Sequence, residues 1–127
     1  MEASNYWTSV SNHVELQPGP PQTTTQNWIL LKDSNDPTVV YITQDANPVT
    51  AITYDSNAPN HFLLKAYNPG DVTQQFLVNP ATTDALASIS CKSNVSIFAV
   101  AMAGDTEGSK IGPGTSNIKQ WYLDTTV

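Results

Sequence analysis

The segment Gln26–Leu30 (QNWIL) decides the fold of this chain, because two close copies of it follow, Gln74–Val78 (QQFLV) and Lys119–Leu123 (KQWYL). The aromatic residue at the centre of the segment returns after 48 and then after 45 residues. A period of this size is typical of structural repeats, in which each unit buries its apolar face against its neighbours. The sequence therefore predicts a molecule built from three related units.

The similarity extends well upstream of the central aromatic residue. The stretch Asn12–Trp28 aligns without a gap on Asn60–Phe76, and Glu107–Trp121 follows the same course with two residues fewer. A proline and a glycine mark a turn at about the same place in each unit. These pairs are Pro18 with Gly19, Pro69 with Gly70, and Pro113 with Gly114.

Short strands are predicted between the aromatic residues. Apolar and polar residues alternate with period two in Thr38–Thr43 and Val49–Tyr54, and again in the matching stretches Ala85–Ser90 and Val95–Val100. Loops rich in Asn, Asp, Ser, Gly and Pro separate them, so each unit is expected to hold about four strands. We expect no helix, because no window has helical apolar spacing and nine prolines would break most candidates.

Three units with a Gln-x-aromatic signature resemble the β-trefoil of ricin-B-type lectins, and the resemblance covers nearly the whole chain. It implies an all-β fold and a single domain over residues 1–127, with repeats at about 1–34, 35–82 and 83–127. In that family the aromatic residue packs in the core and the Gln makes a structural hydrogen bond. Phe76 replaces the family's Trp, and Lys119 stands where Gln is expected. An immunoglobulin-like or other sandwich is the alternative, in which the repeated spacing would be coincidence.

The first unit is about ten residues shorter than the others before its central aromatic, Trp28, so its opening strand is expected to be missing. An eleven-stranded barrel, a double role for residues 1–4, and an edge supplied by a neighbouring chain all remain open, since unpaired edges invite pairing.

The composition excludes several classes of function. A net charge of −6 with only five Lys and Arg disfavours nucleic acid and anionic membranes as partners. Cys91 is the single cysteine, cannot form an internal disulfide, and is expected to be an inert structural thiol. No charged-then-apolar leader stands at the N-terminus, which favours a cytoplasmic location or leaderless secretion.

Few residues offer catalytic chemistry, so we do not expect an enzyme, a cofactor or a metal site. His13 and His61 occupy equivalent positions in two units, and we expect the threefold arrangement to keep them too far apart to bind one metal. The acidic residues Asp33, Asp36, Asp71, Asp105 and Glu107 are scattered, and turn caps are the expected role for most of them.

Sugar recognition needs an aromatic or histidine platform with hydrogen-bonding side chains around it. The second unit has this mixture. The resemblance implies that Asp55 matches the acid after the second strand, Tyr67 the stacking aromatic, and Asn68 or Asp71 the group before the Gln-x-aromatic segment. Lys65 would flank the site. The predicted carbohydrate-binding residues are Asp55, Asn57, His61, Tyr67, Asn68 and Asp71.

Two functions follow as hypotheses. The first is a non-enzymatic lectin, similar to cytoplasmic trefoil lectins of fungi, that binds galactose or N-acetylgalactosamine-type glycans. A homodimer is one assembly that this hypothesis leaves open. The second is a β-trefoil protease inhibitor acting through the proline-rich loop 17–22, because a stiff loop loses little entropy on binding.

Overall fold

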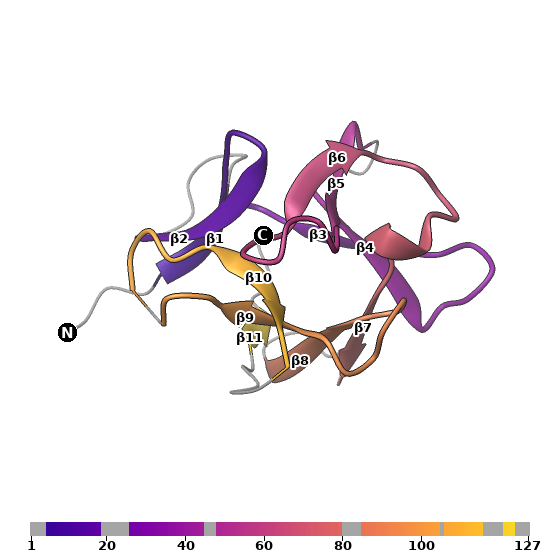
Figure 1. Ribbon diagram of the computed structural model, residues 1–127. Helices are drawn as coiled ribbons and strands as arrows, with labels where there is room; N and C mark the ends of the chain where they lie inside the picture. Colours follow the sequence, from indigo (N-terminus) through magenta and orange to yellow (C-terminus); the bar gives the residue numbers. More distant parts are fainter. Residues whose placement is uncertain are drawn as a thin grey trace.

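The computed structural model describes residues 5–18, 26–44, 48–79, 85–104, 106–115 and 121–123. Over these ranges the chain is all-β and antiparallel, with a single short 3-10 helix and no α-helix, as the sequence predicts (Figure 1). The elements are β1 (Asn5–Val10), β2 (His13–Pro18), β3 (Ile29–Lys32), β4 (Val39–Thr43), β5 (Thr50–Thr53), β6 (Leu63–Ala66), η1 (Val72–Gln74), β7 (Phe76–Asn79), β8 (Ala85–Cys91), β9 (Phe98–Ala101), β10 (Ile111–Gly114) and β11 (Trp121–Leu123).

The strands expected from period-two alternation coincide with β4, β5, β8 and β9. β4 differs from the expected alternation, because its sequence VVYIT is an almost continuous apolar run and all five of its residues are buried. β9 starts at Phe98, three residues later than expected, because Asn94 forms a turn there. The Asn94 side chain accepts a hydrogen bond from the amide of Ser96, and its carbonyl accepts one from the amide of Ile97.

The strands fall into two sets. Five of them pair in series, in the order β3, β4, β7, β8 and β11. The other six form three hairpins, β1–β2, β5–β6 and β9–β10, which Figure 1 shows in indigo, magenta to pink, and orange. The second and third units therefore each supply four strands, and the first unit supplies three strands among the described residues.

The three hairpins are joined to one another by main-chain hydrogen bonds. β2 is linked to β6, the start of β6 to β10, and the start of β10 back to β2, so that the links close a ring. The bonds are Leu64 N to Asn12 O (2.7 Å), Phe62 N to Ile111 O (2.9 Å) and Leu16 N to Ser109 O (2.8 Å). Segments from all three units thus meet at one place in the fold.

The core gathers apolar side chains from all three units around Phe76, which is 1% exposed. Trp28 and Trp121 are only partly buried and pack against the side of this core. Trp7 of β1 bridges them, because its ring lies edge-to-face with Trp28 (6.5 Å between centroids) and with Trp121 (5.1 Å). Phe76 is therefore the deepest of the three predicted anchors, and Trp7 is a fourth that links the other two.

The glutamines of the signature make matching hydrogen bonds in the first two units. Gln26 Nε2 donates to Thr8 Oγ1 (3.2 Å) and to the carbonyl of the last residue of β2 (3.2 Å). Gln74 Nε2 donates to Thr53 Oγ1 (3.2 Å) and to the carbonyl of the last residue of β6 (2.9 Å). Each glutamine ties the two strands of its own hairpin to the segment that follows them.

The indoles show a second correspondence, between the first and third units. Trp28 Nε1 donates to the carbonyl of Trp7 in β1 (2.8 Å), and Trp121 Nε1 donates to the carbonyl of Ala99 in β9 (2.9 Å). β1 and β9 are the first strands of their hairpins. Phe76 has no N–H group, so the second unit keeps the ring without this bond.

Cys91 at the end of β8 is buried and free. Burial raises the pKa of its thiol to about 12, so the reactive thiolate is disfavoured at neutral pH. This agrees with the structural role expected for it.

Candidate functional site

Asp55, in the loop after β5, forms a turn through its own side chain and main-chain carbonyl. The Asp55 carboxylate accepts a hydrogen bond from the amide of Asn57 (2.9 Å), and its carbonyl accepts one from the amide of Ala58 (2.8 Å). The second carboxylate oxygen pairs with Lys65 Nζ at 2.9 Å. The Asn57 amide first, and Lys65 second, hold the pKa of Asp55 below its ordinary value. Asp55 is thus an ionised group at the surface.

Lys65 forms an ion pair with Asp55 and lies two residues before Tyr67 in the chain. Successive side chains of a strand point to opposite faces, so Lys65 and Tyr67 lie on the same face of the hairpin. The ladder continues one residue past β6, since the amide of Tyr67 donates to the carbonyl of Val49 (3.0 Å). The side chain of Lys65 is 49% exposed and Tyr67 is half-buried. We call Asp55, Lys65, Tyr67 and Asn68 the Tyr67 surface.

The ring of Tyr67 packs against Tyr41, whose hydroxyl belongs to a partly buried hydrogen-bond network. It lies edge-to-face with Tyr41 at 5.3 Å between centroids. The Tyr41 hydroxyl donates to Asp33 Oδ1 (2.8 Å) and accepts from the amide of Gly70 (2.9 Å) and from Gln75 Nε2 (2.9 Å). Burial raises the pKa of Tyr67, and the neighbouring Tyr41 and Asp33 raise it further. Tyr67 therefore stays a neutral phenol on a fixed support.

Asn68 and Asp71 serve the turn that leads into Gln74. Asp71 caps η1, because one of its carboxylate oxygens accepts from both the amide (3.0 Å) and the hydroxyl (2.6 Å) of Thr73. The amide of Asn68 donates to Gln74 Oε1 (2.9 Å). The Asn68 side chain is exposed next to Tyr67, whereas Asp71 is engaged in holding the turn.

His61 lies apart from the Tyr67 surface and corrects one expectation. The rings of His13 and His61 are in edge-to-face contact, 5.8 Å between centroids, so the prediction that symmetry keeps them apart is wrong. The two residues sit where the hairpins join, and this junction brings them together. β10 also approaches closely here, since a Cβ on Gly112 would lie 2.8 Å from the Cα of His61.

The histidine contact is flanked by charged groups. His13 Nε2 donates to Glu15 Oε1 at 2.8 Å, and this bond is the main reason that the pKa of Glu15 is lowered. His61 Nδ1 is buried without a hydrogen-bond partner. Burial first, then Lys110 and His13, lower the pKa of His61. In the described part of the chain, no three His, Cys, Asp or Glu side chains are grouped to hold a metal.

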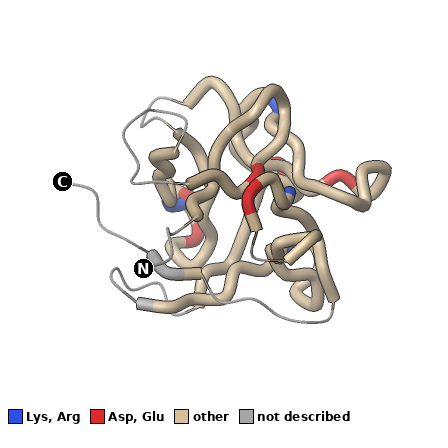
Figure 2. The backbone as a smooth tube through the Cα atoms, turned by 90° about the vertical axis from the view of Figure 1, so that its left-hand side faces the viewer, with Lys and Arg blue, Asp and Glu red and all other residues tan. Residues whose placement is uncertain are grey.

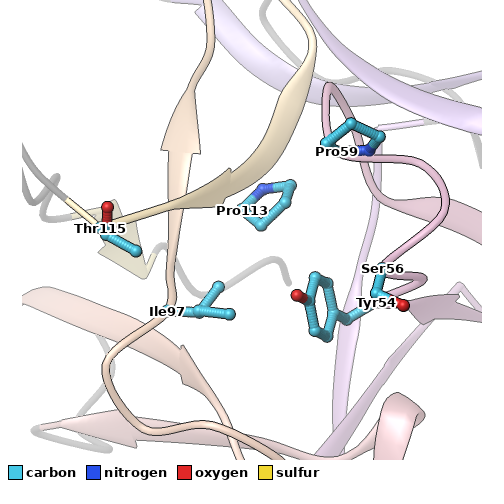
Figure 3. Close-up of a pocket in the computed structure, with 6 residues that line it drawn as sticks. All are labelled: Tyr54, Ser56, Pro59, Ile97, Pro113 and Thr115. Atoms are coloured by element: carbon cyan, nitrogen blue, oxygen red, sulfur yellow. The ribbon is translucent and has the colours of Figure 1, made fainter.

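A small pocket opens between the second and third units (Figure 3). Its volume is about 220 Å³. The loop after β5 forms one wall, and the segment before β9 together with β10 and the residue after it forms the other. The lining residues are Tyr54, Ser56, Pro59, Ile97, Pro113 and Thr115. None of these six residues was among the predicted ligands.

Two other acidic residues have the turn role that was expected for them. Asp33 Oδ2 accepts from the amides of Asn35 and Asp36 (both 3.1 Å). Asp36 Oδ1 accepts from the amide (3.0 Å) and hydroxyl (2.6 Å) of Thr38.

Charged residues form short, separate stretches along the described backbone (Figure 2). Of the proline-rich loop 17–22, only Gln17 and Pro18 lie within the described residues, and Asp105 lies outside them.

Comparison of the chain with protein-family models, with curated proteins and with solved structures found no match. Within the described ranges, no helix has the length and apolar character needed to cross a membrane.

The six predicted carbohydrate-binding residues lie in three different parts of the structure. Asp55 pairs with Lys65, which lies on the same strand face as Tyr67, and the exposed Asn68 follows Tyr67 in the chain. Asn57 and Asp71 hold turns on either side of that face. His61 faces the junction of the hairpins. Sequence reasoning missed Tyr41, whose buried hydroxyl supports Tyr67. It also missed Trp7 as a core ring, although Trp7 lies in the first strand of a hairpin and its indole could have signalled an anchor.

Proposed function

We propose that the chain adopts a β-trefoil and acts as a non-enzymatic carbohydrate-binding protein. The observation that carries this proposal is the matching pair of hydrogen bonds made by Gln26 and Gln74. In ricin-B-type lectins, which the sequence resembles, the Gln of the signature has a structural role of this kind. The bonds of Gln26 and Gln74 support the proposal because they are of the kind that the resemblance implies.

The strand order gives further support to a trefoil. A trefoil combines a barrel built from the outer strands of each unit with one hairpin per unit. The series from β3 to β11 matches five of the six barrel positions, and the three joined hairpins match the remaining strands. A sandwich offers no reason for three hairpins to meet in a ring, since it packs two sheets face to face.

The Tyr67 surface has the chemistry that a sugar requires. The half-buried ring of Tyr67 offers an apolar contact on a rigid support. Asp55 provides an ionised acceptor, Lys65 a donor, and Asn68 both kinds of group. The Asp55–Lys65 pair is exposed to solvent, so its rearrangement toward a ligand costs little. We propose that terminal galactose or N-acetylgalactosamine residues bind here.

A glycan array tests the function. Labelled protein is expected to be retained by glycans with terminal galactose or N-acetylgalactosamine, and Tyr67→Ala is expected to weaken that retention. Tyr6→Ala, a change of another half-buried tyrosine in β1, is the matched control and should bind as the unmodified chain does. A folded sample that is retained by no glycan on the array would refute the proposal.

A further inference from the structure

The pocket between the second and third units is a place where two rigid walls face each other. Figure 3 shows the Tyr54 ring directed into the space between the loop that carries Ser56 and Pro59 and the side that carries Ile97 and Pro113. The pocket is formed by segments from two different units. The Tyr67 surface belongs to the second unit alone. The two places share the loop after β5, because Asp55 lies between the lining residues Tyr54 and Ser56.

The lining has an amphipathic and uncharged character. Pro59, Pro113, Ile97 and the Tyr54 ring supply apolar contact area. Hydroxyl groups come from Tyr54, Ser56 and Thr115, and each can donate as well as accept. None of the six lining residues carries a charge at neutral pH. A ligand that fits this lining has an apolar face, several hydroxyl groups and no net charge.

Both walls are held in place before any ligand arrives. The amide of Tyr54 donates to the carbonyl of Thr73 (2.8 Å), and its ring lies edge-to-face with the fully buried Phe62, 6.5 Å between centroids. On the opposite side, Pro113 is paired with Ala99 in the β9–β10 ladder. A preformed site loses little conformational entropy when it binds.

One hydrogen bond joins the walls directly. The amide of Phe62, next to the loop after β5, donates to the carbonyl of Ile111 in β10 (2.9 Å). The close approach of Gly112 to His61 fixes the same junction, because no other residue would fit there without moving the backbone. The spacing of the two walls is thus set by the main chain rather than by mobile side chains.

The volume limits the size of the ligand. At about 220 Å³ the pocket is below the roughly 300–1,000 Å³ of sites for drug-sized molecules, so it has room for one six-membered ring. We propose that this pocket seats a single neutral pyranose ring, as a second sugar site distinct from the Tyr67 surface. This inference rests on the proposed function, and it adds that two sites on one chain allow simultaneous attachment to two sugar residues.

Titration of ¹⁵N-labelled protein with monosaccharides tests the inference, because amide signals report each site separately. The probes are galactose, N-acetylgalactosamine, glucose and mannose, with glucuronate as a charged counterpart. We expect a neutral sugar to shift the amides of Ile97 and Thr115, which lie on the wall remote from Asp55, and glucuronate to shift them less. Tyr67→Ala should leave these shifts in place.

Blocking variants complete the experiment. Thr115→Trp, at an exposed position, should fill the pocket and abolish the shift of Ile97 while leaving those of Lys65 and Asn68. Ser56→Trp fills the pocket from the opposite wall and serves if the first variant does not fold. Ser34→Trp, at another exposed serine, is the matched control and should change nothing. Tyr54→Phe should weaken binding about 3- to 10-fold, the loss expected for one neutral hydrogen bond.

The outcomes separate the two proposals. Sugar-induced shifts confined to Lys65, Tyr67 and Asn68 would overturn the pocket and leave the carbohydrate-binding function standing. Pocket shifts that persist in both Thr115→Trp and Ser56→Trp would also overturn it. If no sugar shifts any amide and no glycan retains the protein, both proposals are wrong.

Discussion

The first and second units of this chain carry the same hydrogen-bonding pattern in different surroundings. Gln26 and Gln74 bind the same kinds of partners, but Gln74 is 1% exposed and Gln26 is only partly buried. The ring that follows each glutamine differs in the same way, since Phe76 is fully buried and Trp28 lies at the edge of the core. The local motif is therefore set within a unit, whereas its burial depends on neighbours.

Strand pairing explains the difference. β4 lies between β3 and β7, and β7 lies between β4 and β8, so the outer strands of the second unit are paired on both sides. Among the described residues, β3 of the first unit pairs with β4 alone. In place of a full strand environment, Trp28 has the indole of Trp7, which also reaches Trp121. The first unit replaces sheet contacts by aromatic contacts.

The largest difference in stability is expected between variants that remove the aromatic ring of the second unit and that of the first. Phe76→Ala should lower the free energy of unfolding by about 3–5 kcal/mol, because it removes a fully buried aromatic side chain. Trp28→Ala should cost clearly less, because Trp28 is already partly exposed. Denaturant unfolding of both variants measures the two costs. Equal losses would show that the units are equally buried in solution.

A smaller difference in stability is expected between variants of the two signature glutamines. Gln74→Ala should cost about 1–3 kcal/mol, because it leaves the buried Thr53 hydroxyl and a strand carbonyl without their partner. Gln26→Ala removes the two corresponding bonds where water can replace them, and about 1 kcal/mol or less is expected. Gln74→Ala additionally removes the acceptor of the Asn68 amide. Both variants replace a glutamine by alanine, and denaturant unfolding measures the stability lost by each. A greater cost at Gln26 would contradict the assigned difference in burial.

The smallest effect concerns pH at the junction of the hairpins. Burial lowers the pKa of His61 from its ordinary 6.5, so the unfolded chain takes up a proton first as the pH falls below that value. Stability is thus full above pH 6.5 and decreases as the pH falls toward the lowered pKa. Glu15 has a lowered pKa as well, and its contribution is lost only below 4.5. The two groups act in separate windows.

Unfolding free energies measured between about pH 7.5 and pH 5 test this dependence. His61→Gln should flatten the decrease in that range and keep the loss below pH 4.5. His13→Gln should instead reduce the loss below pH 4.5, because it removes the main hydrogen bond to Glu15. An unchanged slope in His61→Gln would mean that His61 is hydrated rather than buried.

Some features could be predicted from the sequence because they are local. Alternation over 85–90 and a short run of β-branched and aromatic residues over 38–43 both favour strands, and the proline content disfavours long helices. The Asx turn at Asp55 and the cap at Asp71 follow from short polar side chains that bond amides two residues on. The resemblance implied a structural hydrogen bond for the Gln of the signature, and Gln26 and Gln74 make such bonds.

Other features were decided only by the tertiary structure, since they depend on which units become neighbours. His13 and His61 are 48 residues apart in sequence yet touch, because equivalent positions converge where the hairpins meet. The walls of the pocket come from loops of two units, so no single segment signals it. The local sequence was sufficient for strands such as β4 and β8 and for the turn at Pro69 and Gly70, whereas Pro113 and Gly114, also expected in a turn, lie within β10. Contacts between units, which packing alone selects, determined the depth of each anchor and the shape of the candidate sites.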